Sequence, residues 1–307
     1  MTEAVKFADT DTLRIAYLEQ GPEDGWPVIL SHGFPYDVHA FAEVAPVLTR
    51  AGARVIMPFT RGFGPTRFVS TAARRNGQQA ARGLDVLQLS DVMGLDRPIL
   101  AGFDWGGNAS CVAAALWPER FGGLVSYAGY DIIDVGAQRH AVSPSLERVF
   151  WYQHLFQTER GRECLTGHRR DFCRMLWREW SPGWNFDEAT FERSAMSFDN
   201  PDFVDVVIHA YRHVFGLEAG EPMLQSLEDR LSQKPTIPVP TVTIDGALDP
   251  LKPGGTADHA RFFTGKHEHR IVAAGHNVPQ QLPEEFADAI IRVLSWLRPS
   301  GANSQRP

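Results

Sequence analysis

Two patterns of apolar and polar residues alternate along the first 130 residues of the chain. Short apolar runs end in turns, as in WPVILSHG, ARVIMPFTRGFG, RPILAGFDWGG and FGGLVSYAGY, and helical patterns lie between them, over 77–93 and 108–117. This alternation is typical of βα units that build a mostly parallel, doubly wound sheet. The sequence therefore predicts an α/β fold.

The middle of the chain has a different pattern. Strand signals are absent over 132–221, and aromatic and charged residues mix at helical spacing in LERVFWYQHLFQTERGRECL and FVDVVIHAYRHVFG. Strand patterns resume with VPTVTIDGALDP and HEHRIVAAGH, and the helical PEEFADAIIRVLSWL follows. We predict a core domain over 1–131 and 222–298, a helical cap over 132–221, and a disordered tail over 299–307.

Composition narrows the choice of partners more than the choice of fold. The 307 residues are 43% hydrophobic, with a net charge of −7 and no basic stripe, which favours small molecules over nucleic acid as partners. Cys111, Cys164 and Cys173 lack the spacing of a zinc site or disulfide framework, so reduced thiols are expected. The N-terminal segment lacks a signal-peptide pattern and no run is long enough to span a bilayer, which predicts a cytoplasmic protein without a membrane partner. The sequence leaves the oligomeric state open.

The stretch AGFDWGGNAS, residues 101–110, has the G-x-nucleophile-x-G pattern of a nucleophile elbow. Its central residue is Asp104, where serine is the usual choice. A tight turn between strand and helix would project this carboxylate above the sheet, and the N–H groups and dipole of the following helix would keep it ionised. Taken alone, the pattern also fits an aspartate that caps a helix.

Two later residues follow strands in the chain order that an acidic elbow requires. Asp249 lies in GALDP after the strand PTVTIDG, and His276 lies in AGHNVPQ after the strand HRIVAAG. We expect Asp104 to be the nucleophile, His276 the general base and Asp249 the acid that orients it. Three other carboxylates compete for the orienting role: Asp245, Asp131 and Asp134.

The motif SHGFP predicts the donors of an oxyanion hole. The backbone N–H of Phe34, after the His-Gly pair, is expected to face the elbow, and the N–H of Trp105 to be the second donor. His32 lies in the turn between strand and loop, so we expect it to be structural rather than catalytic.

In their order along the chain, HGFP, RGFG, GFDWGG, LDP and GHNVPQ make the sequence similar to the α/β-hydrolase fold family over nearly its full length. Within that family, an aspartate elbow resembles the branch of epoxide hydrolases and haloalkane or haloacid dehalogenases, whereas esterases and lipases carry serine there. A carboxylate suits displacement at a saturated carbon, which gives an alkyl–enzyme ester that water activated by His276 hydrolyses. Such a mechanism needs no cofactor or metal.

The leaving group separates the two activities of this branch. The resemblance to epoxide hydrolases implies two cap tyrosines that donate to the opening ring, and Tyr152 in FWYQHLFQ and Tyr211 in HAYRHVFG stand at such positions, with His154 as an alternative donor. Haloacetate dehalogenases typically carry arginine after the nucleophile, and many haloalkane dehalogenases carry asparagine after the His-Gly pair. This chain has Trp105 and Phe34 there. An epoxide hydrolase with an apolar epoxide as substrate is therefore the favoured prediction.

Aromatic residues of the cap keep the dehalogenase alternative open. Trp105 is also similar to the halide-binding tryptophan of haloalkane dehalogenases, and a second indole donor has four candidates: Trp151, Trp177, Trp180 and Trp184. In either case, four residues are expected to contact the substrate: Phe34, Trp105, Trp151 and His154. A non-catalytic binding protein of the same fold is the third interpretation, and it would predict a broken triad.

Overall fold

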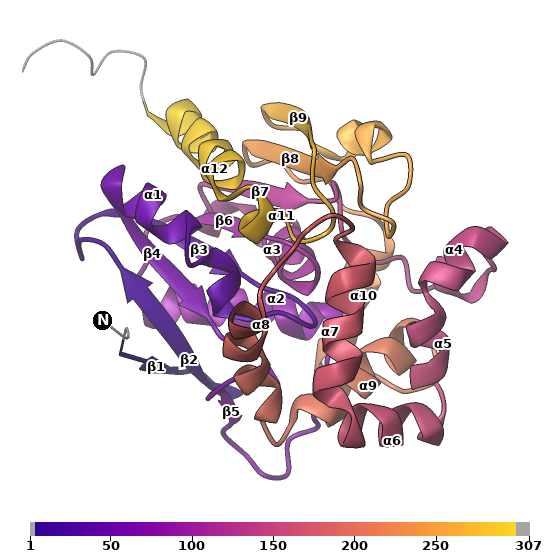
Figure 1. Cartoon of the computed structure of the whole chain (residues 1–307). Coiled ribbons are helices and arrows are strands. Elements are labelled where there is room, and N and C mark those ends of the chain that lie inside the picture. The colour runs from indigo at the N-terminus through magenta and orange to yellow at the C-terminus, as the bar shows by residue number, and fades with distance from the viewer. Residues whose placement is uncertain (1–3, 299–307) are drawn as a thin grey trace, which may run out of the picture.

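The computed structural model of the protein describes residues 4–298, so the tail predicted over 299–307 lies outside the described residues. Its centre is one twisted sheet with the strand order β1-β2-β4-β3-β6-β7-β8-β9, with β5 paired to β2 (Figure 1). The strands are β1 (Lys6–Asp9), β2 (Leu13–Gln20), β3 (Trp26–Ser31), β4 (Ala53–Pro58), β5 (Arg67–Phe68), β6 (Ile99–Gly102), β7 (Gly123–Tyr127), β8 (Thr241–Gly246) and β9 (His267–Val272).

The sheet is parallel from β4 to β9, as the alternation of strands and helices predicts. At one edge, β2 pairs antiparallel with β1, β4 and β5. The sequence analysis identified no strand before Trp26. The reason is that β2 buries four consecutive residues, Ile15 to Leu18, so that the alternation typical of an edge strand is lost.

Helices of the core flank this sheet. They are α1 (Val44–Arg50), α2 (Gln79–Val92), α3 (Trp105–Leu116), α10 (Gln225–Ser232), α11 (Val278–Gln281) and α12 (Pro283–Leu297). Helix α1 packs against α12, and α2 packs against α3 and α10. Two of them, α2 and α3, correspond to the helices predicted over 77–93 and 108–117. Helix α3 begins earlier than predicted because Asp104 is its N-cap, with an oxygen that accepts from the N–H of Trp105.

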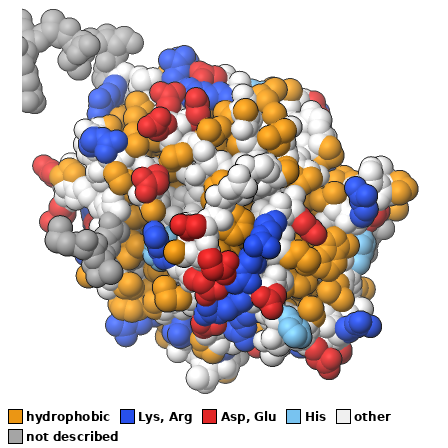
Figure 2. Space-filling view, in the orientation of Figure 1, with side chains coloured by type: hydrophobic (Ala, Val, Ile, Leu, Met, Phe, Trp, Pro, Cys, Tyr) orange, Lys and Arg blue, Asp and Glu red, His pale blue; other side chains and the backbone are white. Residues whose placement is uncertain are grey.

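The cap is a continuous insertion between β7 and β8, and its helices gather on one side of the sheet (Figure 1). They are α4 (Pro144–Val149), α5 (Trp151–Phe156), α6 (Glu159–Gly167), α7 (Arg169–Trp180), α8 (Glu188–Ala195) and α9 (Phe203–Val214). The inner face of α7 buries Leu176, Trp177 and Trp180. On its outer face, Arg174 pairs with Glu188 and Glu192, and Figure 2 shows acidic and basic side chains gathered there over α7 and α8. The cap thus presents aromatic rings inward and ion pairs outward.

A buried carboxylate fastens the cap to the core. Asp37, in the loop after β3, accepts hydrogen bonds of 2.7 Å from the hydroxyls of Ser194 and Ser197 in the cap. It also lies 2.8 Å from Nδ1 of His39. Burial alone would raise the pKa of Asp37, but these hydrogen bonds and the nearby histidine lower it below its ordinary value. The carboxylate therefore stays ionised and holds the two parts together.

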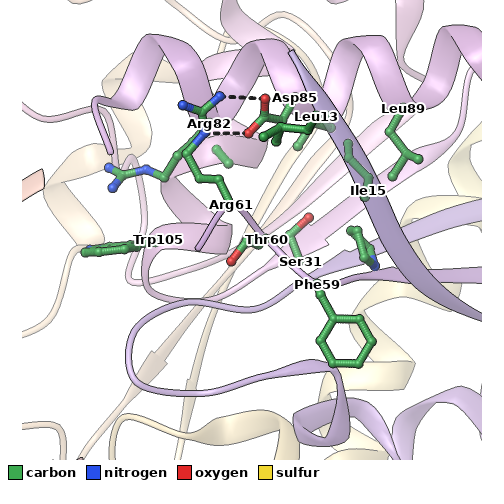
Figure 3. A pocket seen from close by; sticks show the side chains of 13 residues that line it. Leu13, Ile15, Ser31, Phe59, Thr60, Arg61, Arg82, Asp85, Leu89 and Trp105 are labelled. Atoms are coloured by element: carbon green, nitrogen blue, oxygen red, sulfur yellow. Dashed lines mark hydrogen bonds and ion pairs between the residues drawn. The ribbon is translucent and has the colours of Figure 1, made fainter. Parts of the chain in front are cut away.

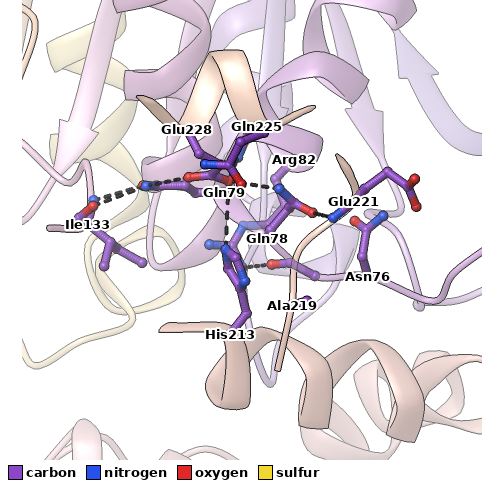
Figure 4. A network of polar contacts seen from close by, with 12 residues as sticks. Asn76, Gln78, Gln79, Arg82, Ile133, His213, Ala219, Glu221, Gln225 and Glu228 are labelled. Carbon is purple, nitrogen blue, oxygen red and sulfur yellow. Dashed lines mark hydrogen bonds and ion pairs between the residues drawn. The ribbon is translucent and has the colours of Figure 1, made fainter. Parts of the chain in front are cut away.

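Both connections between core and cap are bound at the start of α2 (Figure 4). The side chain of Gln79 exchanges two hydrogen bonds with the backbone of Ile133, of 2.9 and 3.0 Å. Gln78 accepts a hydrogen bond from the N–H of Glu221. Glu228 of α10 accepts from both glutamine side chains and from the backbone N–H of the second residue of α2. The start of α2 therefore holds both connections between core and cap, at Ile133 and Glu221, which we call the hinges.

No helix within residues 4–298 is both long enough and apolar enough to cross a membrane. The three cysteines are free thiols, and Cys111 and Cys173 are buried.

Candidate active site

The nucleophile elbow lies where β6 meets α3. Asp104 has φ 53° and ψ −133°, a conformation that a residue other than glycine adopts only where its surroundings impose it. Neighbouring glycines make this turn possible: a Cβ on Gly106 would lie 1.9 Å from the carbonyl oxygen of Ser31, and one on Gly102 would lie 2.4 Å from the backbone of Gly106. The turn holds the carboxylate at the carboxyl end of the central strand.

The two oxygens of Asp104 have different partners. Oδ1 accepts hydrogen bonds from the backbone N–H groups of Phe34, at 2.7 Å, and Trp105, at 2.6 Å. Oδ2 lies 3.2 Å from Nε2 of His276. A Cβ on Gly33 would lie 2.1 Å from Oδ1, so the His-Gly turn needs glycine there. The structure thus places both predicted donors on one oxygen and leaves the other beside the predicted base.

His276 lies between two carboxylates. Its Nδ1 is 2.9 Å from Oδ2 of Asp249, which also accepts a hydrogen bond of 2.7 Å from the hydroxyl of Tyr127. Burial alone would lower the pKa of His276, but the charges and hydrogen bonds of Asp249 and Asp104 raise it to about 10. Burial opposes ionisation of Asp249, but His276 and Tyr127 keep its pKa below the ordinary value. The ring is therefore an imidazolium at neutral pH.

The competing carboxylates have other partners. Asp245 accepts hydrogen bonds from the N–H and hydroxyl of a threonine, at 2.6 and 2.7 Å. Asp134 pairs with a lysine at 2.7 Å near the surface. Asp131 lies on the wall of the cavity described below, 3.6 Å from a lysine Nζ, and burial raises its pKa to about 6. Among these four carboxylates of the described chain, Asp249 is the one hydrogen-bonded to His276.

His32 stays out of this chemistry. Its Nδ1 donates to the carbonyl of Gly33 at 3.1 Å, and its Nε2 accepts from the N–H of Thr60 at 3.1 Å. Burial lowers its pKa to about 4, so the ring is neutral and has both nitrogens occupied. It supports the turn that carries Phe34, in agreement with the structural role expected.

A cavity of about 350 Å³ opens between the triad and the cap. The cap supplies apolar side chains and the two predicted tyrosines, while the core supplies most of the polar ones. Its lining comprises Arg82, Asp104, Trp105, Asn108, Ala128, Asp131, Ile133, Gln138, Val142, Leu146, Phe150, Tyr152, Gln153, Ala210, Tyr211, Val214, Leu251, Lys252 and His276. Its size suits a small organic molecule.

The two tyrosines meet on the cap side of this cavity. Tyr152 of α5 and Tyr211 of α9 are buried, and their rings lie perpendicular with centroids 5.4 Å apart. Tyr211 is also 5.7 Å from the ring of Trp105. Burial raises the pKa of both phenols, and the charge of Asp104 acts in the same direction. Both hydroxyls therefore keep their protons at neutral pH.

Two residues expected to contact the substrate lie elsewhere. His154 has a half-exposed side chain that lies 2.7 Å from a carboxylate oxygen of Glu147. The indole N–H of Trp151 points to Glu179, at 3.4 Å. The cause is the helical geometry of α5: residues 151 and 154 are three positions apart and share a face, whereas Tyr152 faces inward. Neither residue lines the cavity.

The cap tryptophans differ in what their N–H groups bind. The N–H of Trp177 donates to the carbonyl of Pro35 at 2.7 Å, and Trp184 stacks on Trp177. Trp180 is 1% exposed and its N–H has no hydrogen-bond partner within the described chain. Its ring is 5.4 Å from that of His276. Trp180 is therefore the second indole that lies beside the triad.

Sequence reasoning did not identify several polar residues of the site. Tyr127 lies in an apolar run typical of a buried strand, so nothing marked its hydrogen bond to Asp249. Arg82, Asn108 and Gln153 stand in helical patterns in which nothing marks them as residues of a site. Only the fold shows that these three line the cavity.

Comparisons with known proteins agree with this arrangement. A family model described as the alpha/beta hydrolase fold matches residues 27–279. A crystal structure from Klebsiella pneumoniae, described as that of a proposed epoxide hydrolase, is 42% identical, covers 94% of this chain and 96% of its own, and superposes with a TM-score of 0.92.

Curated relatives are similar over different lengths. Epoxide hydrolase A of Mycobacterium tuberculosis is 27% identical over 327 aligned positions, which cover 95% of this chain and 97% of the relative. A haloalkane dehalogenase of Mycolicibacterium paratuberculosis is 36% identical over 130 residues, which cover 41% of each chain. The match to this dehalogenase thus spans about two fifths of its length.

Proposed function

The chain belongs to the α/β-hydrolase fold family, and from this premise we propose that it is an epoxide hydrolase. The observation that carries the proposal is the pair of buried phenols, Tyr152 and Tyr211, on the wall of the cavity that holds Asp104. A carboxylate suits attack on saturated carbon, and a phenol beside it suits proton delivery to an epoxide oxygen. The similarity to epoxide hydrolase A along 95% of this chain supports the same choice.

In the first step, Oδ2 of Asp104 attacks a ring carbon of the epoxide. The bond from that carbon to the ring oxygen breaks, and the oxygen takes a proton from Tyr152 or Tyr211. The N–H groups of Phe34 and Trp105 hold Oδ1, which leaves Oδ2 to react. The product is a hydroxyalkyl ester of Asp104.

The second step uses His276 as a base. Once Asp104 is an ester, it no longer stabilises the imidazolium, and the proton that His276 releases replaces the one taken from the tyrosine. The neutral ring then takes a proton from water that attacks the ester carbon Cγ, while the N–H groups of the oxyanion hole stabilise the charge on Oδ1. The bond between Cγ and Oδ2 breaks, and Oδ2 leaves in the diol with the proton that the imidazolium returns. The new carboxyl group of Asp104, which now holds an oxygen from water, then gives its proton to His276.

The decisive experiment uses His276→Gln, which keeps the nucleophile and removes the base. Mixed with styrene oxide, this variant should accumulate an adduct of the full epoxide mass on the peptide that contains Asp104, because ring opening loses no atoms. A second variant, with Asp104→Ala added, is the control and should form none. In heavy-oxygen water, one turnover of the unaltered protein should label Asp104. Label in the diol on that first turnover would show direct attack of water and overturn the proposal.

One observation favours a second function, haloalkane dehalogenation. The indole N–H of Trp180 is buried without a partner in the described chain, and its ring lies 5.4 Å from that of His276. Trp105 lines the cavity, so two indoles lie close to the triad, and a departing halide would need N–H donors of this kind. The His276→Gln variant separates the two functions. A haloalkane would leave an adduct lighter than the substrate by one hydrogen halide, and halide would appear in solution in equal amount. Adducts from 1-chlorobutane and none from styrene oxide would favour the dehalogenase.

A further inference from the structure

Arg82 of α2 is a buried arginine whose hydrogen bonds do not use all of its donors. Its side chain is 4% exposed. Nε and Nη2 donate to Oδ1 of Asn108, at 3.3 and 2.8 Å, and Nη1 donates to the carbonyl of Gly77 at 2.9 Å. A guanidinium has five N–H groups. One hydrogen on each terminal nitrogen therefore has no partner among the described residues.

Its charge lacks a carboxylate partner as well. The neighbouring Arg61 is just as buried and forms a two-pronged ion pair with Asp85, both bonds 2.7 Å, which Figure 3 shows beside Arg82. Arg82 forms no ion pair within 4 Å in the described chain, and the carboxylate whose charge acts on it most is Asp104. Burial lowers the pKa of Arg82 to about 10, so it remains a cation at neutral pH. A buried cation without a counterion is costly.

This cation is part of the lining of the main cavity. The guanidinium lies over the ring of Trp105, 4.8 Å from its centroid. Figure 3 shows both side chains at the same end of a smaller void that they help to line. Arg82 and Trp105 separate that void, of about 30 Å³, from the main cavity, which both also line. The side chains that the cap contributes to the lining of the main cavity include apolar Leu146, Phe150 and Val214. The cavity lining therefore combines a buried cation from the core with apolar side chains from the cap.

We propose that Arg82 binds a carboxylate of the substrate, so that the epoxides opened here belong to the class of apolar acids. The inference rests on the proposed epoxide hydrolase function and deepens it. Two donors on the terminal nitrogens of a guanidinium suit a planar carboxylate. Asp104 is negative itself, so an acidic substrate needs a cation close by to approach it. The apolar side chains of the cap then receive the hydrocarbon part of the molecule.

The test compares matched acidic and neutral epoxides. The substrates are the meta and para isomers of carboxystyrene oxide and the corresponding primary amides, and the measure is the ratio of kcat/KM for acid over amide. For the isomer with the higher ratio, the unaltered protein should prefer the acid over its amide at least about tenfold in kcat/KM. This is the effect of one charge-assisted hydrogen bond. Arg82→Gln should bring the ratio close to one, and Arg82→Lys should retain part of it. Lys252→Gln, which removes the lysine of the cavity lining, is the control and should preserve the preference.

A binding measurement separates this inference from the reaction itself. The probe is 4-ethylbenzoate, which has no epoxide, with 4-ethylbenzamide as its neutral match, and calorimetry gives both affinities. Tighter binding of the acid that is lost in Arg82→Gln supports the anion site, even if no epoxide is turned over and the proposed function fails. Turnover of acid and amide at equal kcat/KM, with equal binding of both probes in Arg82→Gln and unaltered protein, would overturn the inference and leave the epoxide hydrolase standing.

Discussion

At the scale of single residues, the assignment of chemical roles depends on which atom faces which partner. The elbow glycines and the order of aspartate, aspartate and histidine predicted the triad, because parallel strands bring their carboxyl ends to one edge of the sheet. The roles of the two oxygens of Asp104 could not be predicted. They follow from distances of 2.6 and 2.7 Å to two N–H groups and 3.2 Å to His276, which the letters of the sequence do not contain.

The tyrosine pair gives the first prediction at this scale. Tyr152→Phe and Tyr211→Phe should each slow formation of the ester by about 10²- to 10³-fold, because each removes a donor to developing charge. Mass spectrometry of the adduct over time, in the His276→Gln background, measures this step alone. Tyr130→Phe is the matched control: its phenol is buried outside the cavity and donates to a backbone carbonyl at 2.8 Å. A variant with both replacements that reacts at the original rate would contradict the assignment.

The second residue-scale prediction concerns the orienting acid. Asp249→Asn should slow hydrolysis of the ester at least about 10²-fold, because an amide cannot stabilise the imidazolium that forms when water is deprotonated. Formation of the ester should be affected less, and single-turnover mass spectrometry resolves the two steps. Asp131→Asn, on the cavity wall without a hydrogen bond to His276, is the comparison and should hydrolyse its ester much faster. The reverse pattern would place the orienting acid after β7.

At the scale of elements, the helices and strands agree with the periodic patterns of the sequence, except where contacts between distant segments determine the structure. The parallel strands and cap helices match their patterns, whereas β2 was missed because it is buried on both faces. The support of the hinges was equally hidden. Gln78 and Gln79 resemble any polar start of a helix, and only the folded chain brings Glu228 to them.

The hinge support yields an element-scale prediction. Glu228→Gln removes a partly buried charge that accepts three hydrogen bonds at the start of α2, so the free energy of unfolding should fall by about 2 kcal/mol. Denaturant unfolding measures it. Glu284→Gln is the matched control, since Glu284 is an exposed acid in the first turn of α12. Equal effects of the two substitutions would mean that the network does not stabilise the hinges.

At the scale of the whole molecule, the site is assembled from segments far apart in the sequence. Core residues 34, 104, 249 and 276 were predicted to meet, since each follows a strand of one sheet, and the structure brings them together. The cap was harder to predict. Helical periodicity locates an inward face only when the axis of the helix is known, so Tyr152 and Tyr211 were placed correctly on the cavity wall while Trp151 and His154 were not. The role of Arg82 could not be predicted either, because its helical pattern does not show that the side chain is buried.

The triad also connects the site to the stability of the whole molecule through pH. Burial of His276 would lower its pKa, but the charges and hydrogen bonds of Asp249 and Asp104 outweigh burial and raise the pKa from 6.5 to about 10 in the folded chain. The folded state therefore holds a proton that the unfolded chain loses above about pH 6.5. Its contribution to stability is complete below that pH and declines as the pH rises toward 10.

Denaturant unfolding of the protein and of His276→Gln over this range compares the chain with and without the titrating imidazole. The difference in unfolding free energy between the two should change between pH 6.5 and 10, with the unaltered protein losing its relative advantage. Asp104→Asn removes one of the two carboxylates that hold the proton, so the loss should then occur at lower pH. A difference that stays constant from pH 6.5 to 10 would mean that the folded chain does not hold this proton. His276 would then be neutral in the resting protein and would form no ion pair with Asp104.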